Sequence, residues 1–114
     1  MNNIKIQMNK KVYWAGIEYM YTSNSNELGK LKGGFVYAFV NAYNVKVALS
    51  KINKELNQIQ LIPVEIEFIE PYNKETKWEK PEQTQNYLDL FDKSQKSNEV
   101  FFDIFFAYEN IEKE

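Results

Sequence analysis

Residues 35–59, "FVYAFVNAYNVKVALSKINKELNQI", contain a strand pattern followed at once by a helix pattern. Seven of the first eight residues are apolar, aromatic or β-branched, which is typical of a buried strand. Asn44 is a favourable N-cap, so we expect a helix that begins at Val45. Apolar residues then recur every three or four positions, which predicts one buried stripe along the helix. The stripe consists of Val45, Ala48, Leu49, Ile52, Leu56 and Ile59.

The sequence before this stretch predicts the other strand of a hairpin. Residues 11–21, "KVYWAGIEYMY", are rich in aromatic and β-branched residues. The polar connector at residues 22–34 ends in Gly33 and Gly34, which we expect to supply positive φ where the chain re-enters the sheet. Gly29 and Lys30 precede Leu31 instead of Ser or Thr, and a strand follows instead of a helix. This excludes a phosphate-binding loop of the Walker type.

The sequence after residue 59 predicts a strand, a helix and a last strand. Residues 61–69 alternate in polarity after Pro63, which indicates a strand with one buried face. Pro81 suits the first turn of a second helix, which we expect to end near Lys93. Residues 99–108, "EVFFDIFFAY", form the last predicted strand. The inner side of the second helix is expected to carry Thr84, Tyr87, Leu88 and Phe91.

The predicted fold is α+β, with the element order β-β-α-β-α-β in a single domain that covers residues 1–114. Two helices on one face of a four-stranded sheet would make a two-layer α/β sandwich. Because right-handed crossovers make the strands that a helix joins parallel, we expect a mixed sheet.

Side chains alternate between the two faces of a sheet, so each predicted strand divides into two sets. We expect the first set to face the helices: Tyr13, Ala15, Ile17, Val36, Ala38, Val40, Val64, Ile66, Phe68, Phe102, Ile104 and Phe106. The opposite face then carries Trp14, Glu18, Met20, Phe35, Tyr37, Phe39, Glu65, Glu67, Phe101, Asp103 and Phe105.

The second predicted face combines large aromatic side chains with four carboxylates and carries no lysine. An apolar patch of this kind is typical of a partner-binding surface, and interfaces favour aromatic anchors. Two alternatives stay open: the face pairs with its copy in a homodimer, or other parts of the chain cover it. The cover would be the hairpin tip, the loop that contains Trp78 or the N-terminal residues 1–7. The candidate partner-binding residues are Trp14, Glu18, Phe35, Tyr37, Phe39, Glu65, Glu67, Phe101, Asp103 and Phe105.

The composition excludes several kinds of chemistry. All 14 basic residues are lysine, and the chain contains no arginine, histidine or cysteine. It therefore lacks the usual general base, thiol chemistry and the bidentate recognition of phosphate. The net charge of −2 argues against nucleic-acid binding. We expect no enzymatic activity, no cofactor and no resident metal. A carboxylate-dependent metal enzyme that uses Glu18, Glu65, Glu67 and Asp103 is a further alternative.

These observations favour a non-enzymatic protein-interaction module. The concrete form is a small bacterial or phage inhibitor of the immunity type, which occludes a basic toxin or nuclease. The alternative is a homodimeric small-ligand-binding or regulatory domain. No apolar run has the roughly 18 residues of a membrane span. The N-terminal residues lack the apolar core of a signal peptide, so a cytoplasmic location is expected.

Overall fold

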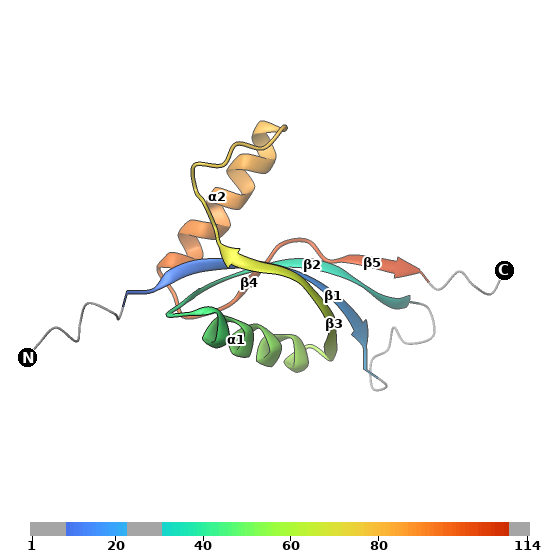
Figure 1. The fold of residues 1–114 in the computed structure, drawn as a ribbon. Helices are drawn as coiled ribbons and strands as arrows, with labels where there is room; N and C mark the ends of the chain where they lie inside the picture. The colour runs from blue at the N-terminus through green and yellow to red at the C-terminus, as the bar shows by residue number, and fades with distance from the viewer. Residues whose placement is uncertain (1–8, 23–30, 110–114) are drawn as a thin grey trace, which may run out of the picture.

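The computed structural model describes residues 9–22 and 31–109, and these residues form a sheet with one helix on each face (Figure 1). The strands are β1 (Lys11–Tyr21), β2 (Leu31–Ala42), β3 (Leu61–Pro71), β4 (Phe101–Phe102) and β5 (Phe106–Glu109). The helices are α1 (Val45–Gln58) and α2 (Pro81–Gln95). The predicted α+β class and both predicted helix starts are confirmed. The expectations for residues 1–7 and for the hairpin tip at residues 23–30 lie outside the described residues.

β1 and β2 form the predicted hairpin, but β2 begins earlier than expected, at Leu31. Gly33 and Gly34 therefore belong to the strand, and neither has a positive φ, so that prediction was wrong. Glycine is required there by close approach instead. A Cβ at Gly33 would lie 2.1 Å from the carbonyl oxygen of Tyr19, and one at Gly34 would lie 2.3 Å from that of Phe106.

α1 packs on the first face of the sheet. The Asn44 side chain accepts a hydrogen bond of 2.9 Å from the amide of Val47, which caps the first turn as the sequence predicts. The middle of the predicted stripe is buried, whereas Val45 and Ile59 at its ends are exposed. We call the resulting cluster the first core. Its members are Tyr13, Ala15, Ile17, Tyr19, Val36, Ala38, Val40, Ala42, Ala48, Ile52, Leu56 and Leu61.

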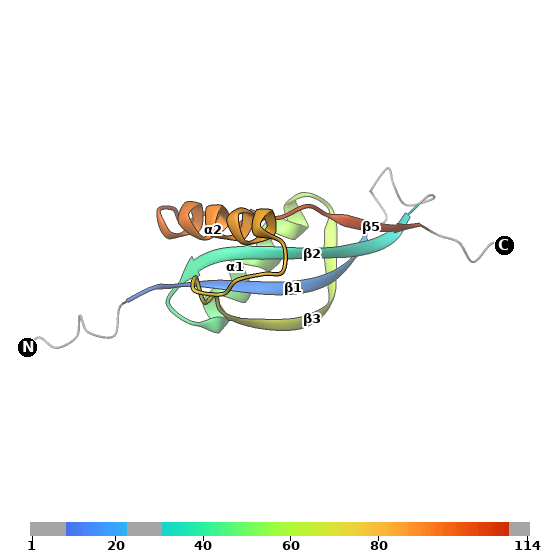
Figure 2. The same cartoon turned by 90° about the horizontal axis from the view of Figure 1, so that it is seen from above.

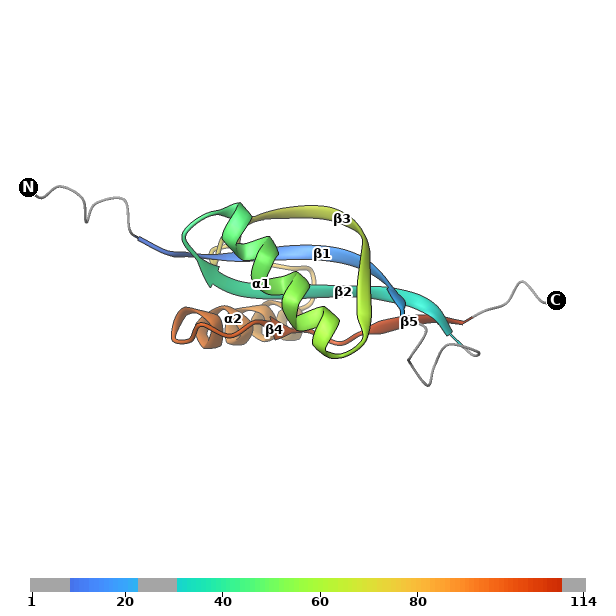
Figure 3. The same cartoon turned by 90° about the horizontal axis from the view of Figure 1, so that it is seen from below.

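The strands lie in the order β3-β1-β2-β4, and β5 pairs with β2 beyond β4. Every pairing is antiparallel, so the predicted mixed sheet was wrong. The crossover through α1 does join two strands of the same direction, β2 and β3. However, β1 lies between them, and both pair with it in the opposite direction. Figure 3 shows α1 lying across β1 and β2 on its way to β3.

α2 packs on the opposite face from α1, so the prediction of both helices on one face was wrong (Figure 1). The chain enters α2 from one edge strand, β3, and leaves it toward the other edge, β4. Tyr87, Leu90 and Phe91 of α2 pack on side chains of β1 and β2 that point away from the first core. We call this cluster the second core. Its buried members are Val12, Trp14, Phe39, Tyr72, Tyr87, Leu90 and Phe91.

β3 contains two extra residues relative to its partner β1, namely Val64 and Glu67. Each extra residue is a bulge, which reverses the faces to which the following side chains point. Phe68 therefore packs against the second core and Val64 is exposed, although both were expected to face the helices. Ile66 packs against the first core as predicted.

The last predicted strand is interrupted and forms β4 and β5 instead of one element. Phe101 pairs with Phe39, and Phe106 pairs with Phe35. The chain takes five residue steps from Phe101 to Phe106 but only four from Phe39 to Phe35, so the segment between β4 and β5 contains one extra residue. This extra residue places Phe106 on the second face, beside Phe35, and not on the first face as expected. Ile104, also expected in the first core, is exposed.

Candidate functional site

Aromatic rings fill the half of the second face that lies beneath α2. Trp14 is central: its ring centroid lies 4.8 Å from that of Phe68, 5.1 Å from that of Tyr72 and 5.3 Å from that of Tyr37. Trp78, from the loop before α2, lies 5.7 Å from Trp14 and donates a 2.9 Å hydrogen bond from its Nε1 to the hydroxyl of Tyr72. α2 and the Trp78 loop therefore cover this half of the face.

Four of the candidate partner-binding residues lie in this covered half. Trp14 and Phe39 are buried, with exposed fractions of 9% and 0%. Tyr37 and Phe101 are half-buried and pack against the second core. The side chains of Trp14 and Phe39 therefore stabilise the attachment of α2 and are not surface contacts.

Asp103 connects the sheet to α2. Its carboxylate accepts a 3.1 Å hydrogen bond from the side-chain amide of Asn86, and its backbone amide donates a 2.9 Å hydrogen bond to the carbonyl of Tyr37. These two hydrogen bonds, to Asn86 and Tyr37, hold the segment after β4 against α2 and β2.

Phe105 lies on the first face and not on the second, as a result of the extra residue between β4 and β5. Its ring centroid is 5.8 Å from that of Tyr19 and 5.3 Å from that of Phe102, and both of those residues belong to or pack against the first core. Phe105 is therefore separated by the sheet from the other candidate residues.

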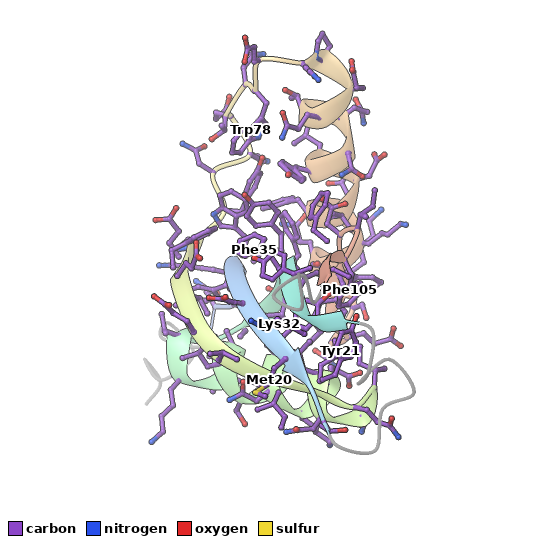
Figure 4. All side chains as sticks on the ribbon, turned by 90° about the vertical axis from the view of Figure 1, so that its right-hand side faces the viewer. Met20, Tyr21, Lys32, Phe35, Trp78 and Phe105 are labelled. Atoms are coloured by element: carbon purple, nitrogen blue, oxygen red, sulfur yellow. The ribbon has the colours of Figure 1, made fainter. Side chains whose placement is uncertain are left out.

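The rest of the second face is not covered by α2 (Figure 2). Figure 4 views the molecule from this end and labels Phe35 and Met20, with Trp78 farther along beside α2. Large apolar side chains are exposed here, with exposed fractions of 54% for Phe106, 46% for Met20, 44% for Tyr108 and 40% for Ile62. We call this region the open patch. Its members are Glu18, Met20, Gly33, Phe35, Ile62, Glu65, Phe106 and Tyr108.

The sheet arranges the open patch in two rows that run across β3, β1, β2 and β5. Residues paired across neighbouring antiparallel strands point to the same face, so the register defines each row. The outer row is Ile62, Met20, Gly33 and Tyr108. The inner row, closer to α2, is Glu65, Glu18, Phe35 and Phe106.

Charge and aromatic area lie on different sides of the open patch. Glu18 and Glu65 occupy the side formed by β1 and β3, and the extra residue Glu67 lies on the same strand as Glu65. No ion pair joins any of these three carboxylates to a cation within the described parts of the chain. Partial burial, followed by the negative charges of Glu18 and Glu67, raises the pKa of the Tyr108 phenol. The negative charges of Glu18 and Glu67 therefore reach the aromatic side of the patch.

Gly16 marks the boundary between the open patch and the second core. A Cβ at this position would lie 2.5 Å from Cε1 of Phe68 and 2.9 Å from Cζ of Phe35. The two rings occupy the space above the β1 backbone that a side chain would fill. Phe35 also contacts Tyr37, with ring centroids 5.0 Å apart. Phe35 thus extends the aromatic cluster of the core into the patch.

The structure brings together four of the ten predicted site residues, Glu18, Phe35, Glu65 and Glu67, in or beside the open patch. The prediction missed Ile62, Phe106 and Tyr108 as site residues. Met20 was placed on the correct face but was not a candidate. Strict alternation along the strand from Phe102 puts Phe106 and Tyr108 on the first face, whereas the structure has them on the second. The one signal for the interruption before them is the charged Asp103 within an otherwise apolar strand.

Within residues 9–22 and 31–109, no three acidic side chains lie close enough together to hold a metal ion. Neither of the two described helices is long and apolar enough to cross a membrane. Comparison with protein families, with curated protein sequences and with solved structures finds no match to this chain. The class of the protein is defined by its own geometry: an antiparallel α+β sheet with a helix on each face and an exposed acidic and aromatic patch.

Proposed function

We propose that this chain is a non-enzymatic protein-interaction module that binds a basic partner protein through the open patch. The observation that carries the proposal is the exposure of Phe106, Tyr108 and Met20 next to carboxylates that have no cationic partner among residues 9–22 and 31–109. Contiguous exposed apolar side chains are costly in water and commonly mark an interface. Aromatic side chains and methionine are also the residues that interfaces favour.

The charges of the open patch favour a partner that carries lysine or arginine. The carboxylates of Glu18, Glu65 and Glu67 would attract such a partner at long range and then pair with its cations in the contact. The most concrete form of this function is inhibition by occlusion, in which the module covers a positively charged cleft of a toxin or nuclease. The lack of histidine, cysteine and arginine supports a function based on binding.

The same charges disfavour a homodimer formed through this patch. Self-association through this face would bring the carboxylates of two copies into one interface. Like charges in a desolvated contact are repulsive. We therefore place a different, basic protein on the patch and treat the homodimer as an outcome that experiment can distinguish.

The proposal can be tested by affinity capture with immobilised protein and lysate of the native host. The test variant is Phe106→Lys, which places a cation in the patch. The matched control is Ile59→Lys, because Ile59 is also half exposed, at 50%, but follows α1 on the other side of the sheet. We expect the wild type and the control to capture the same basic protein, and Phe106→Lys not to capture it. The bound protein should be released at ~0.5 M salt, where the Debye length is roughly 4 Å.

Two results would overturn the proposal. One is a partner that binds Phe106→Lys as well as it binds the wild type, since the patch would then not be the contact. The other is a monomer with no co-purifying protein at any salt concentration. Thermal unfolding of Phe106→Lys shows whether the variant is folded, so that loss of binding is not mistaken for loss of structure.

A further inference from the structure

The open patch lies in the interior of a sheet face, and this limits how a partner can bind it. The backbone amides and carbonyls of β1 and β2 are paired with neighbouring strands on both sides. An added strand needs free backbone groups at an edge, so it could pair only along the outer sides of β3 and β5, beside the patch and not on it. A partner that lies on the patch itself contacts it through side chains, and a helix, which carries its own hydrogen bonds, suits this position.

α2 shows how this face accepts a helix. It presents Tyr87, Leu90, Phe91 and Ser94 to the sheet, at the spacing i, i+3, i+4 and i+7 of one helix face. It covers only the part of the face near β4, and Gly16 marks the border of that part. On the first face, α1 packs over the first core. The open patch is the part of the second face that α2 leaves uncovered.

The dimensions of the open patch suit one helix. Four strands spaced about 4.8 Å apart span about 14 Å from β3 to β5. A helix with its side chains is about 10–12 Å wide. One helix lying along β1 and β2 would contact both rows of the patch, with β3 under one flank and β5 under the other.

The patch has a different chemistry under each flank of such a helix. Glu18 and Glu65 lie on the side of β1 and β3, whereas Phe35, Phe106 and Tyr108 lie on the side of β2 and β5. Lysine or arginine on one flank would pair with the carboxylates. Leucine, phenylalanine or methionine on the other would pack on the rings.

We infer that the partner contributes an amphipathic helix, basic on one flank and apolar on the other, which lies beside α2 on the open patch. This inference rests on the proposed function, because it names the element of the basic partner that makes the contact. It commits to a helix of another protein as the occupant. A second copy of the chain, or a cover formed by the chain itself, is distinguished by experiment.

The first experiment asks whether the patch is free. The chain has no cysteine, so Phe106→Cys introduces a single thiol at the centre of the aromatic side. We expect a thiol reagent to label it at a rate near that of an unfolded peptide, with sedimentation as a monomer. Slow labelling at every concentration would mean that the chain covers its own patch. Slow labelling that sets in with a monomer–dimer transition would mean that a copy covers it. Either slow result overturns the inference.

The second experiment asks what binds. Two display libraries of equal composition are selected against the wild-type protein, one on a helical-hairpin scaffold and one on a scaffold with an extended loop. We expect the helical library to yield binders with lysine or arginine on one flank. Their affinity should fall by about tenfold or more with Phe106→Lys and with Glu18→Lys, as for anchors at the centre of an interface. Ile59→Lys should leave the affinity within about twofold.

The outcomes separate this inference from the proposed function. If patch-dependent binders come only from the loop library, the inference of a helical contact is wrong, whereas the proposal of a basic partner still stands. Helical binders that are insensitive to Phe106→Lys and Glu18→Lys would overturn the inference, because the helix position would then be elsewhere. If neither library yields patch-dependent binders and lysate capture also fails, both the inference and the proposed function are wrong.

Discussion

Glu18 on β1 and Glu65 on β3 are directly opposite each other in the antiparallel ladder, so two carboxylates point from neighbouring strands toward the same face. Like charges in this position destabilise a pair of strands. Neither carboxylate has a cationic partner in the part of the chain that the structure describes. Folding alone does not favour such a pair, which supports a role for it in binding.

The first prediction concerns this pair of carboxylates. Glu18→Gln removes the repulsion and should raise the free energy of unfolding by about 0.2–1 kcal/mol, the range for a cross-strand pair. The same variant should weaken binding of the basic partner. Urea denaturation at pH 7 measures the first effect and affinity capture the second. Glu79→Gln removes one charge from an exposed loop position and should change neither quantity. A less stable Glu18→Gln protein would show that the pair is not repulsive.

The second prediction concerns the glycine beneath two rings. Gly16→Ala adds a Cβ that would lie 2.5 Å from Phe68 and 2.9 Å from Phe35, so at least one ring must move. Overpacking of this kind typically costs about 1–3 kcal/mol. Denaturant unfolding, followed by tryptophan fluorescence, should therefore show a lower midpoint with an unchanged slope.

A double mutant checks that the rings cause this loss. Phe35→Leu removes the ring atom that the new Cβ approaches, so the cost of Gly16→Ala should be smaller in the Phe35→Leu background. The coupling between contacting residues is commonly about 0.5–3 kcal/mol. Two effects that simply add would exclude the Phe35 ring as a source of the cost and leave Phe68, the nearer ring, as the group that must move.

The third prediction concerns the loop that covers Trp14. The hydroxyl of Thr84 accepts a 2.7 Å hydrogen bond from the backbone amide of Trp78, while Lys80 at the N-cap of α2 makes no side-chain cap. Thr84→Val keeps the shape of the side chain but removes the acceptor, and should cost about 0.5–1.5 kcal/mol. Thr84→Ser keeps the hydroxyl and should retain most of the stability. A larger loss in Thr84→Ser than in Thr84→Val would assign the effect to the methyl group and contradict the prediction.

The fourth prediction concerns alkaline pH. Burial, together with the neighbouring Tyr21, raises the pKa of the Tyr19 phenol far above its ordinary value of 10.0. In the unfolded chain this phenol ionises near pH 10, whereas in the folded protein it stays protonated. Its contribution is therefore fully present below pH 10, and stability is lost as the pH rises further. Unfolding free energies at pH 8 and at about pH 11 should differ less for Tyr19→Phe than for the wild type. The same pH dependence in both proteins would rule out Tyr19 as a cause.

The features predicted correctly from the sequence depend on local interactions. The N-cap at Asn44 and the proline at the start of α2 act within one helical turn. The faces of β1 and β2 follow from alternation because the register of this hairpin is continuous from Lys11 to Met20. In each case the deciding contacts lie close along the chain or in a regular ladder.

The features predicted wrongly depend on pairing between distant segments. The extra residues Val64 and Glu67 can be recognised only when β3 is aligned with β1. The interruption before Phe106 can be recognised only when β5 is aligned with β2. Each of them moves side chains to the opposite face. This is why the aromatic part of the open patch escaped the prediction, whereas Glu18 and Phe35, in the regular hairpin, did not.

The irregular course of β3 has a second consequence, because β3 is an edge strand with no described strand on its outer side. A long exposed edge can template the addition of another chain and start aggregation. Pro63 lacks one backbone donor, and the bulges at Val64 and Glu67 break the spacing that an added strand would need. The residues that obscure the register of β3 therefore also disfavour the addition of another strand along this edge.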